Sequence, residues 1–599
     1  MFFDVHSVYS NHEEITCTRV DVDRRRARAE PGNGRPSRRL ATLARARVTR
    51  DRGRDSRTIM SGGSSAANAA HDAMRAAIGE MDASRGFDAV VVCTSNAAQE
   101  AYWQRRLELT RGQAAKEGAT IVCVHEDWAK DGAGNGLGTL YAYEKARAKA
   151  RETGRGDLDE ILANGGTIGM YHTAGKGTRL APLPGSENNN KPGVKLPSLV
   201  TVDGGKENLT ILEAVIRQTG RYASERAGRC SVFWGDQIFV PAAGHGASGK
   251  HHADILAFMG PMPTAEEWRE RGLEKYGLIA VNEANEATQV EKVSYDTAAE
   301  LLKSFGSVAG VGPSLGSFSL SAPLLSGLLE EFKTEIAGKT AKFDSDPHFW
   351  MPLTLSKDAY VKVMSTKGEA EEQSSSHHDR MQAFRAKLLA AHPDKGMFGA
   401  INVGEGSYWW DYGLLALYMK NNLLALGDSE EAKSLRLYLG IPEGARRVDA
   451  QLGATKVDES TVVLASKIDA GHVASSVVSH VCTKNADISN SLLVNVTAKN
   501  IRAHNCVVYN VVDESDEGLI LPDGAVFTNV FIPAKGSDDK HTKLVMSSTT
   551  ATCGGKVFKS KLSQNPYSFN QVYELNADTD VERAYAAAKA AHAEAAAKH

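Results

Sequence analysis

The stretch Phe87–Glu126, "FDAVVVCTSNAAQEAYWQRRLELTRGQAAKEGATIVCVHE", decides the fold class. It begins with "FDAVVVCT" and ends with "ATIVCVHE", two short β-branched runs typical of buried strands, and the segment 97–118 between them has helical spacing. Strand, helix and strand in this order predict a βαβ unit with a parallel sheet. We therefore expect an α/β protein.

Two further segments extend this pattern. "GTIGMYHTAG" (166–175) predicts a strand that runs into a glycine loop, and "LTILEAVIRQTGRYASERA" (209–227) predicts an amphipathic helix leading to the strand "CSVFWGD" (230–236). A nucleotide-binding sheet uses the same order of elements, and its ligands bind beyond the carboxyl ends of the strands. We expect the functional site there.

Composition limits the classes of partner. The chain has 599 residues, of which 42% are hydrophobic, so it can bury large cores in two or more domains. A net charge of -3 gives no overall field for nucleic acid or anionic lipid, so small-molecule partners are expected. The seven cysteines are scattered without a CxxC pair, which favours a reducing compartment and no zinc site. No apolar run reaches membrane-spanning length, so we expect a soluble, cytoplasmic protein.

The first 60 residues differ from the rest because they are rich in arginine and poor in large apolar side chains. Such a segment cannot repay the entropy of ordering, so disorder is expected. Three interpretations stay open: a transit peptide to an organelle such as the plastid, a basic arm for nucleic acid, or an extension ahead of a start at Met60. The third is slightly favoured.

The glycine loop "GMYHTAGKGTRLAPLP" (169–184) suggests phosphate binding, but it is not a P-loop. A P-loop places four residues between its glycines and a hydroxyl directly after the lysine. Here the spacing from Gly169 to Gly175 is one residue too long, and Gly177 follows Lys176. Another phosphate chemistry is needed.

The longer segment "AGKGTRLAPLPGSENNNKPGVKLP" (174–197) resembles the signature loop of sugar-1-phosphate nucleotidyltransferases. Glycines in such a loop let backbone N–H groups approach phosphate, and arginine and lysine neutralise departing pyrophosphate. The insert "GSENNN" lengthens the path from Arg179 to Lys191, so Lys195 is an alternative to Lys191. The matched residues are Gly175, Gly177, Thr178, Arg179 and Lys191.

Three later segments resemble the same family in the same order: "WGDQIF" (234–239), the pair "KYGLIAVNE" and "VEKVSYD" (275–283 and 290–296), and "YWWDYGLLALYMKNN" (408–422). Taken singly, each has an ordinary explanation as a turn aspartate, a loop, core packing or an exposed charge pair. Their occurrence together favours the functional interpretation.

The resemblance implies a Rossmann-like, GT-A-like nucleotidyltransferase domain that uses Mg²⁺, a nucleoside triphosphate and a sugar 1-phosphate. Its implied roles are catalysis by Arg179, Lys191 and Lys292, nucleotide binding by Gly175, Lys176, Gly177 and Thr178, sugar binding by Tyr276, Gly277 and Glu291, and metal binding by Asp236 and Asp411. "DGAGNGLGTL" (131–140) points weakly to the fucose-1-phosphate guanylyltransferase branch. The alternative is a non-catalytic regulatory subunit that binds nucleotide-sugars.

Beyond residue 447 the texture changes to short aliphatic runs separated by small or Asn-rich turns. This spacing is typical of a β-solenoid and resembles the left-handed β-helix of many sugar nucleotidyltransferases. Dimerisation, effector binding and acyl transfer are open roles, and a scaffold is favoured. The predicted inward residues are Ile468, Val473, Val478, Ile488, Val494, Ile501 and Val507.

The predicted domains are an extension (1–60), a catalytic domain (61–447), the β-helix (448–545), through which the chain would form homo-oligomers, and a tail with an Ala-rich helix (546–599). Two polar segments are left over. His377 and His378 are predicted to lie in a solvated loop, and Asp344 and Asp346 either line the sugar pocket or cap a helix.

Overall fold

A computed structural model describes residues 60–82, 85–128, 132–173, 175–243, 249–303, 305–404, 406–534 and 541–599. The predictions for residues 1–59 therefore lie outside the described residues. Contacts group Ala70–His599 into one compact unit, which is the unit described below. Helix α1 (Met60–Glu80) enters this unit at Ala70 and buries Met74, Ala77 and Ile78 in its core.

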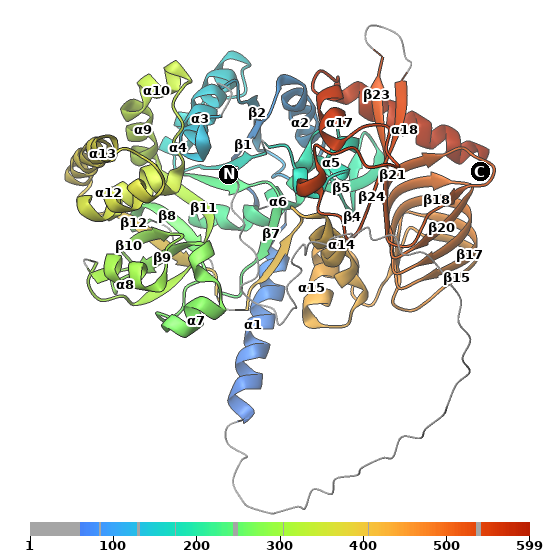
Figure 1. The fold of residues 1–599 in the computed structure, drawn as a ribbon, viewed down its shortest axis with the longest axis horizontal. Coiled ribbons are helices and arrows are strands. Elements are labelled where there is room, and N and C mark those ends of the chain that lie inside the picture. Colours follow the sequence, from blue (N-terminus) through green and yellow to red (C-terminus); the bar gives the residue numbers. More distant parts are fainter. Residues whose placement is uncertain are drawn as a thin grey trace, which may run out of the picture. The chain divides into compact units, whose positions relative to one another are not determined.

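A nine-stranded mixed sheet forms the centre of the first half, with the order β10-β9-β11-β6-β3-β1-β2, and with β8 and β12 paired beyond β11 (Figure 1). Strands β2, β1, β3 and β6 are mutually parallel, as the βαβ pattern predicts. The α/β prediction is thus confirmed. The strands are β1 (Ala89–Thr94), β2 (Thr120–His125), β3 (Thr167–His172), β6 (Arg229–Trp234), β8 (His251–Ala257), β9 (Gly277–Val281), β10 (Ala287–Glu291), β11 (Gly310–Ser321) and β12 (Gly396–Asn402).

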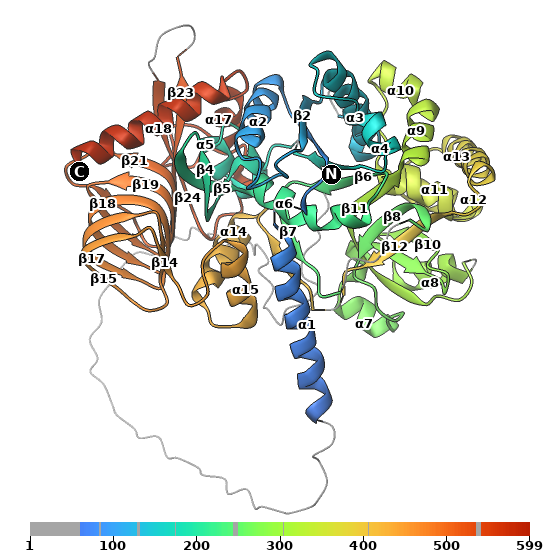
Figure 2. The same cartoon turned by 180° about the vertical axis from the view of Figure 1, so that it is seen from behind.

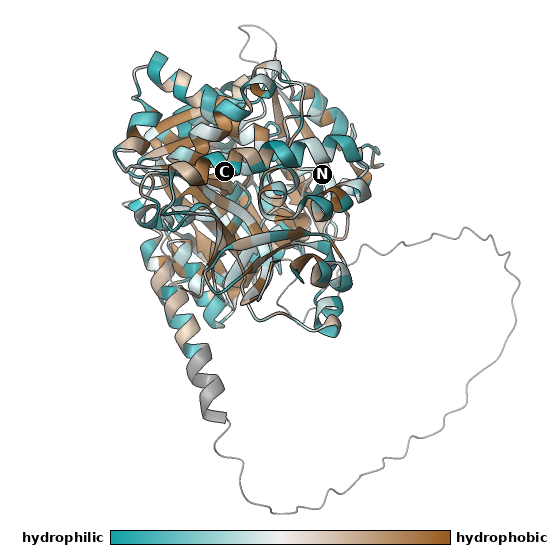
Figure 3. Ribbon diagram, turned by 90° about the vertical axis from the view of Figure 1, so that its left-hand side faces the viewer, coloured by the Kyte–Doolittle hydropathy of each residue, from teal (hydrophilic) through white to brown (hydrophobic). Residues whose placement is uncertain are grey.

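Helices cover both faces of this sheet because both faces of each central strand are apolar. In β1, Val90 and Val92 pack in one core with α2 (Ala97–Leu109) and α6 (Ile211–Thr219). Val91 and Cys93 pack in the other core with α3 (Gly134–Glu152), α4 (Leu158–Ala163) and α9 (Ala322–Glu331). Figure 3 shows the apolar strands in brown inside and more teal on the helices.

The remaining helices of the first half flank this layer or link it to the second sheet. They are α5 (Leu183–Ser186), α7 (Ala265–Glu270), α8 (Tyr295–Lys303), α10 (Lys333–Gly338), α11 (Met351–Thr354), α12 (Lys357–Thr366), α13 (Glu371–Ala391), α14 (Leu415–Leu423) and α15 (Glu430–Tyr438). The loop predicted for His377 and His378 is wrong, because both residues lie in α13 and His378 is buried. Two antiparallel pairs complete this half, β4 (Lys195–Val202) with β5 (Gly205–Thr210) and β7 (Gln237–Val240) with β13 (Tyr408–Asp411).

The second half is built on a largely parallel sheet of eleven strands (Figure 2). Successive strands pair with an offset of 15 residues, as in Asn495 to Asn510. All seven predicted inward residues are buried. The strands are β14 (Arg447–Val448), β15 (Gln451–Val457), β16 (Val462–Leu464), β17 (Lys467–Ala474), β18 (Val477–Ser489), β19 (Leu492–Ala498), β20 (Asn500–His504), β21 (Val507–Asp513), β22 (Leu519–Ile520), β23 (Ala525–Pro533) and β24 (His541–Thr549).

The same backbone conformation recurs at each corner of this sheet. Ala465, His480, Asn495 and Asn510 all have φ between +41° and +56°, one per 15-residue repeat. Asparagine tolerates this left-handed conformation better than most residues, which explains the Asn-rich turns of the sequence. Helices α16 (Gly554–Val557), α17 (Phe569–Leu575) and α18 (Val581–Lys598) follow the sheet.

Candidate functional site

A cavity of about 380 Å³ lies beyond the carboxyl ends of β3 and β6. His172 closes β3 and Asp236 follows β6, and both line the cavity. Burial lowers the pKa of His172 to about 4, so its imidazole is neutral, and its Nε2 lies 2.9 Å from Thr139 Oγ1. The cavity thus lies at the edge of the sheet where the strand order predicts a ligand.

The glycine loop contributes Gly175, Arg179 and Lys191 to the wall of this cavity. Gly175 and Gly177 have φ of +129° and +60°, which favours glycine at both positions. A Cβ on Gly177 would come within 3.0 Å of Lys191 Cβ, so the two ends of the signature loop touch at this glycine.

Two other residues of the loop point elsewhere. The Lys176 ammonium lies 4.9 Å from the centre of the Tyr573 ring of α17. The backbone at Thr178 lies close to Gly554, whose Cβ would be 2.7 Å from Thr178 O. The structure therefore directs Lys176 and Thr178 toward the C-terminal helices, although the resemblance implies nucleotide binding by both.

The two aspartates predicted as metal ligands come together. Strand β13 pairs with β7 so that Asp411 is opposite Gln237, the neighbour of Asp236. A Cβ built on Gly413 would lie 3.0 Å from Asp411 Oδ1, 3.1 Å from Asp236 Oδ2 and 3.6 Å from Lys191 Nζ. Lys191 forms an ion pair with Asp236, whereas Lys195 pairs with Glu187. Three charged groups from distant segments therefore converge on Gly413.

This cradle fits a magnesium ion in its chemistry. Mg²⁺ is usually held by one or two carboxylates and completed by substrate phosphates and water. Asp236 and Asp411 would supply the carboxylates, and Gly413 leaves the space between them open. Among the described residues, no three His, Cys, Asp or Glu side chains form a more complete metal cage.

The segment implied to bind the sugar lies at the other end of the cavity. Gly277 lines the cavity, while Tyr276, Glu291 and Lys292 lie outside the set of described lining residues. Glu291 is buried opposite Gly277 on β10, and its Oε1 is 3.7 Å from the ammonium groups of Lys292 and Lys367. Lys292 therefore pairs with Glu291 behind the wall and does not line the cavity.

Asp346, at the start of the helical turn Asp346–Trp350, lines the cavity beside Gly277. A Cβ on Gly277 would be 3.7 Å from its Oδ2. Burial, with the negative charge of Glu291 nearby, raises the pKa of Asp346 to about 7. The wall next to Gly277 thus carries a carboxyl group that holds a proton near neutral pH.

The N-terminus of α3 is the part of the site that residue types alone did not assign. Gly134 and Asn135 line the cavity, and Asn135 N donates to Asp344 Oδ1 at 3.0 Å. A Cβ on Gly134 would come within 2.5 Å of Phe343 O, so the two segments can only meet at a glycine. The glycines of "DGAGNGLGTL" were the available signal, but they also fit an ordinary surface turn.

In comparisons with known proteins, the chain matches no protein-family model and no curated protein. Among the helices of the described residues, none combines the length and apolar character that crossing a bilayer requires.

Proposed function

We propose that the protein transfers a nucleotidyl group from a nucleoside triphosphate to a sugar 1-phosphate and releases pyrophosphate. The observation that carries this proposal is the convergence of Asp236, Asp411 and Lys191 on Gly413, at a cavity that Gly175 and Arg179 also line. Two carboxylates, two cations and a glycine loop at the end of parallel strands suit a reaction in which charge moves between phosphates.

The proposed step is a single in-line displacement. An oxygen of the sugar phosphate attacks the α-phosphorus of the triphosphate, the new P–O bond forms, and the bond to the bridging oxygen of pyrophosphate breaks. Bound Mg²⁺ would neutralise phosphate charge between Asp236 and Asp411. Arg179 would pair with the departing pyrophosphate, and Lys191 would exchange Asp236 for a phosphate oxygen.

The sugar would occupy the end of the cavity near Gly277, with the base near Gly175. Asp346 and Asp344 then supply carboxyl groups to sugar hydroxyls, in the place where the family resemblance implies Tyr276 and Glu291. The role proposed for Glu291 is indirect, because it lies behind the wall and acts on Asp346 through its charge.

The finer fold proposals follow the same resemblance. The parallel strands with cavity and glycine loop at their carboxyl ends support a GT-A-like catalytic domain. The 15-residue offset and the recurring left-handed corners support a β-helix for the C-terminal strands.

The test is a matrix of five nucleoside triphosphates against several sugar 1-phosphates, with pyrophosphate detection and Mg²⁺ present. One pair should release pyrophosphate in the wild type and lose most of that activity in Asp236→Asn. A wild type that binds a nucleotide-sugar but releases no pyrophosphate with any pair would refute the enzyme and support the regulatory subunit.

A further inference from the structure

The six-residue insert Gly185–Asn190, which separates Arg179 from Lys191, is buried in an unusual way. It carries five polar residues in a row, and each is at most 8% exposed: Ser186, Glu187, Asn188, Asn189 and Asn190. Burying polar groups costs free energy unless they are hydrogen-bonded, so a fully buried polar insert requires dedicated partners.

Glu187 is the centre of these contacts. Its side chain is 0% exposed, and it forms an ion pair with Lys195. Its Oε1 accepts a hydrogen bond from the Tyr509 hydroxyl of β21, and its Oε2 accepts one from the Tyr585 hydroxyl of α18, both at 2.5 Å. Burial, with the charge of Glu187 nearby, raises the pKa of both tyrosines well above its usual value, so both remain neutral donors.

The rest of the insert is held by the same part of the chain. Asn576, which follows α17, donates to Gly185 O at 2.8 Å, and Asn189 donates to Tyr573 O at 2.7 Å. At the far end, Asn190 Oδ1 accepts from the indole of Trp103 in α2 at 3.0 Å. The insert therefore bonds to α17, α18, β21 and α2 within six residues.

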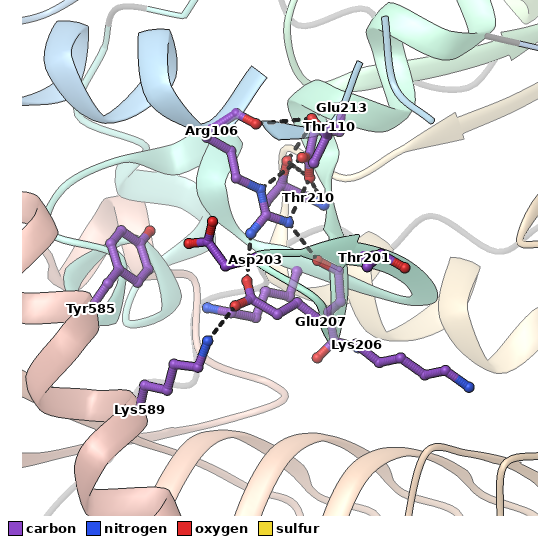
Figure 4. Close-up of polar contacts among 12 residues, drawn as sticks. Arg106, Thr110, Thr201, Asp203, Lys206, Glu207, Thr210, Glu213, Tyr585 and Lys589 are labelled. Carbon is purple, nitrogen blue, oxygen red and sulfur yellow. Dashed lines mark hydrogen bonds and ion pairs between the residues drawn. The ribbon is translucent and has the colours of Figure 1, made fainter. Parts of the chain in front are cut away.

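Helix α18 is in turn fixed against the first half. The rings of Tyr585 and Tyr102 of α2 stack with centroids 4.6 Å apart. Figure 4 shows Lys589 reaching Glu207 from α18, at 3.2 Å. Glu207 is held by Arg106, which also pairs with buried Glu213 at 2.7 Å. The helix predicted as a tail is thus part of the packing around the insert.

The insert leads directly into the candidate site. Lys191 follows Asn190 in the chain and forms the ion pair with Asp236. Gly177 touches both Lys191 and Pro184, the residue just before the insert, at 3.0 and 3.1 Å from a Cβ on that glycine. A shift of the insert would therefore move Lys191 and the glycine loop together.

We propose that the C-terminal half positions the signature loop, with Glu187 as the positioning residue through which Tyr509 and Tyr585 fix Lys191 for phosphate transfer. This inference rests on the proposed function. It makes the C-terminal strands and α18 a required part of the catalytic unit, beyond the scaffold role favoured from the sequence.

The test compares Tyr585→Phe and Glu187→Gln with Tyr143→Phe in the full-length protein. Tyr143 is a matched control, because its buried hydroxyl also donates to a carboxylate, Asp159 Oδ1 at 2.9 Å, in a core on the other face of the sheet. Since a misplacement of about 1 Å can cost about 100-fold in rate, we expect kcat to fall by about 10- to 100-fold in the two test variants, with KM for the triphosphate nearly unchanged. Tyr143→Phe should keep wild-type kcat.

Hydrogen exchange of residues 183–194 provides a readout that does not need activity. Exchange there should become faster in Tyr585→Phe and Glu187→Gln than in Tyr143→Phe, while the sheet strands stay protected. Unchanged exchange, or a kcat loss no larger than that of the control, would overturn the positioning role. If the wild type shows no activity with any substrate pair, the proposed function fails, and exchange alone decides whether the insert is held as inferred.

Discussion

Replacing Gly413 by alanine tests the metal cradle with a single methyl group. The new Cβ would lie 3.0 Å from Asp411 Oδ1 and 3.1 Å from Asp236 Oδ2, which is closer than nearly all real Cβ contacts. Each carboxylate must therefore move by a few tenths of an ångström. The backbone of Gly413 lies outside the left-handed region, so alanine adds no backbone strain.

The magnitude follows from the strict geometry of Mg²⁺, whose ligands lie at about 2.0–2.1 Å in a near-octahedral arrangement. If a misplacement of about 1 Å costs about 100-fold, a few tenths correspond to a loss of about 3- to 10-fold in kcat at limiting Mg²⁺. Extra Mg²⁺ should restore part of the loss, because the methyl group weakens the site without removing a ligand.

The assay is pyrophosphate release at a series of Mg²⁺ concentrations, with thermal unfolding measured in parallel. Gly427→Ala is the control, because its Cβ would meet only Ala432 Cβ at 3.4 Å and Leu424 O at 3.5 Å. Both variants should unfold near the wild-type temperature. A wild-type Mg²⁺ dependence in Gly413→Ala would refute the cradle between Asp236 and Asp411.

Three other predictions use the same site. Asp236→Asn and Asp411→Asn should each abolish most turnover without unfolding the protein, and near-normal rates at limiting Mg²⁺ would exclude that aspartate as a ligand. Arg179→Ala should lower kcat by about 100- to 1000-fold with a smaller change in nucleotide KM, and lysine should rescue it only in part; normal kcat would exclude the role. Asp346 has a folded pKa of about 7, above its ordinary value of 3.8, so the folded state binds the extra proton between these values and loses stability as pH rises through this window. Asp346→Asn should therefore raise the melting temperature relative to wild type more at pH 8 than at pH 5, and equal shifts at both pH values would contradict the burial of this carboxyl group.

Local pattern was enough to predict the parallel core. The β-branched runs of β1 and β2 and the helix between them follow from residue spacing, and the seven inward aliphatic residues of the second sheet are buried as the sequence indicates. Helix ends were less well predicted. The helix expected over 209–227 is α-helical only from Ile211 to Thr219, because Gly220 begins a 3₁₀ turn.

The contacts between distant segments could not be predicted in the same way. Nothing local indicates that Glu187 faces Tyr509 and Tyr585, more than 300 residues away. His377 and His378 lie in a polar run, but tertiary packing places them in α13, where His378 Nε2 lies 3.0 Å from Leu355 O. Burial of Glu291 behind Gly277 likewise depends on the pairing of β9 with β10, which residue types do not specify.

The left-handed corners at Ala465, His480, Asn495 and Asn510 limit how the second sheet can change in length. Removing or adding a single residue between two corners would turn every later inward aliphatic residue toward solvent, because side chains alternate between the two faces of a strand. An insertion or deletion of one complete 15-residue turn would keep each corner above its predecessor and each aliphatic residue inside. The distance between the first turns and the strand that carries Tyr509 can therefore change only in whole turns of the coil.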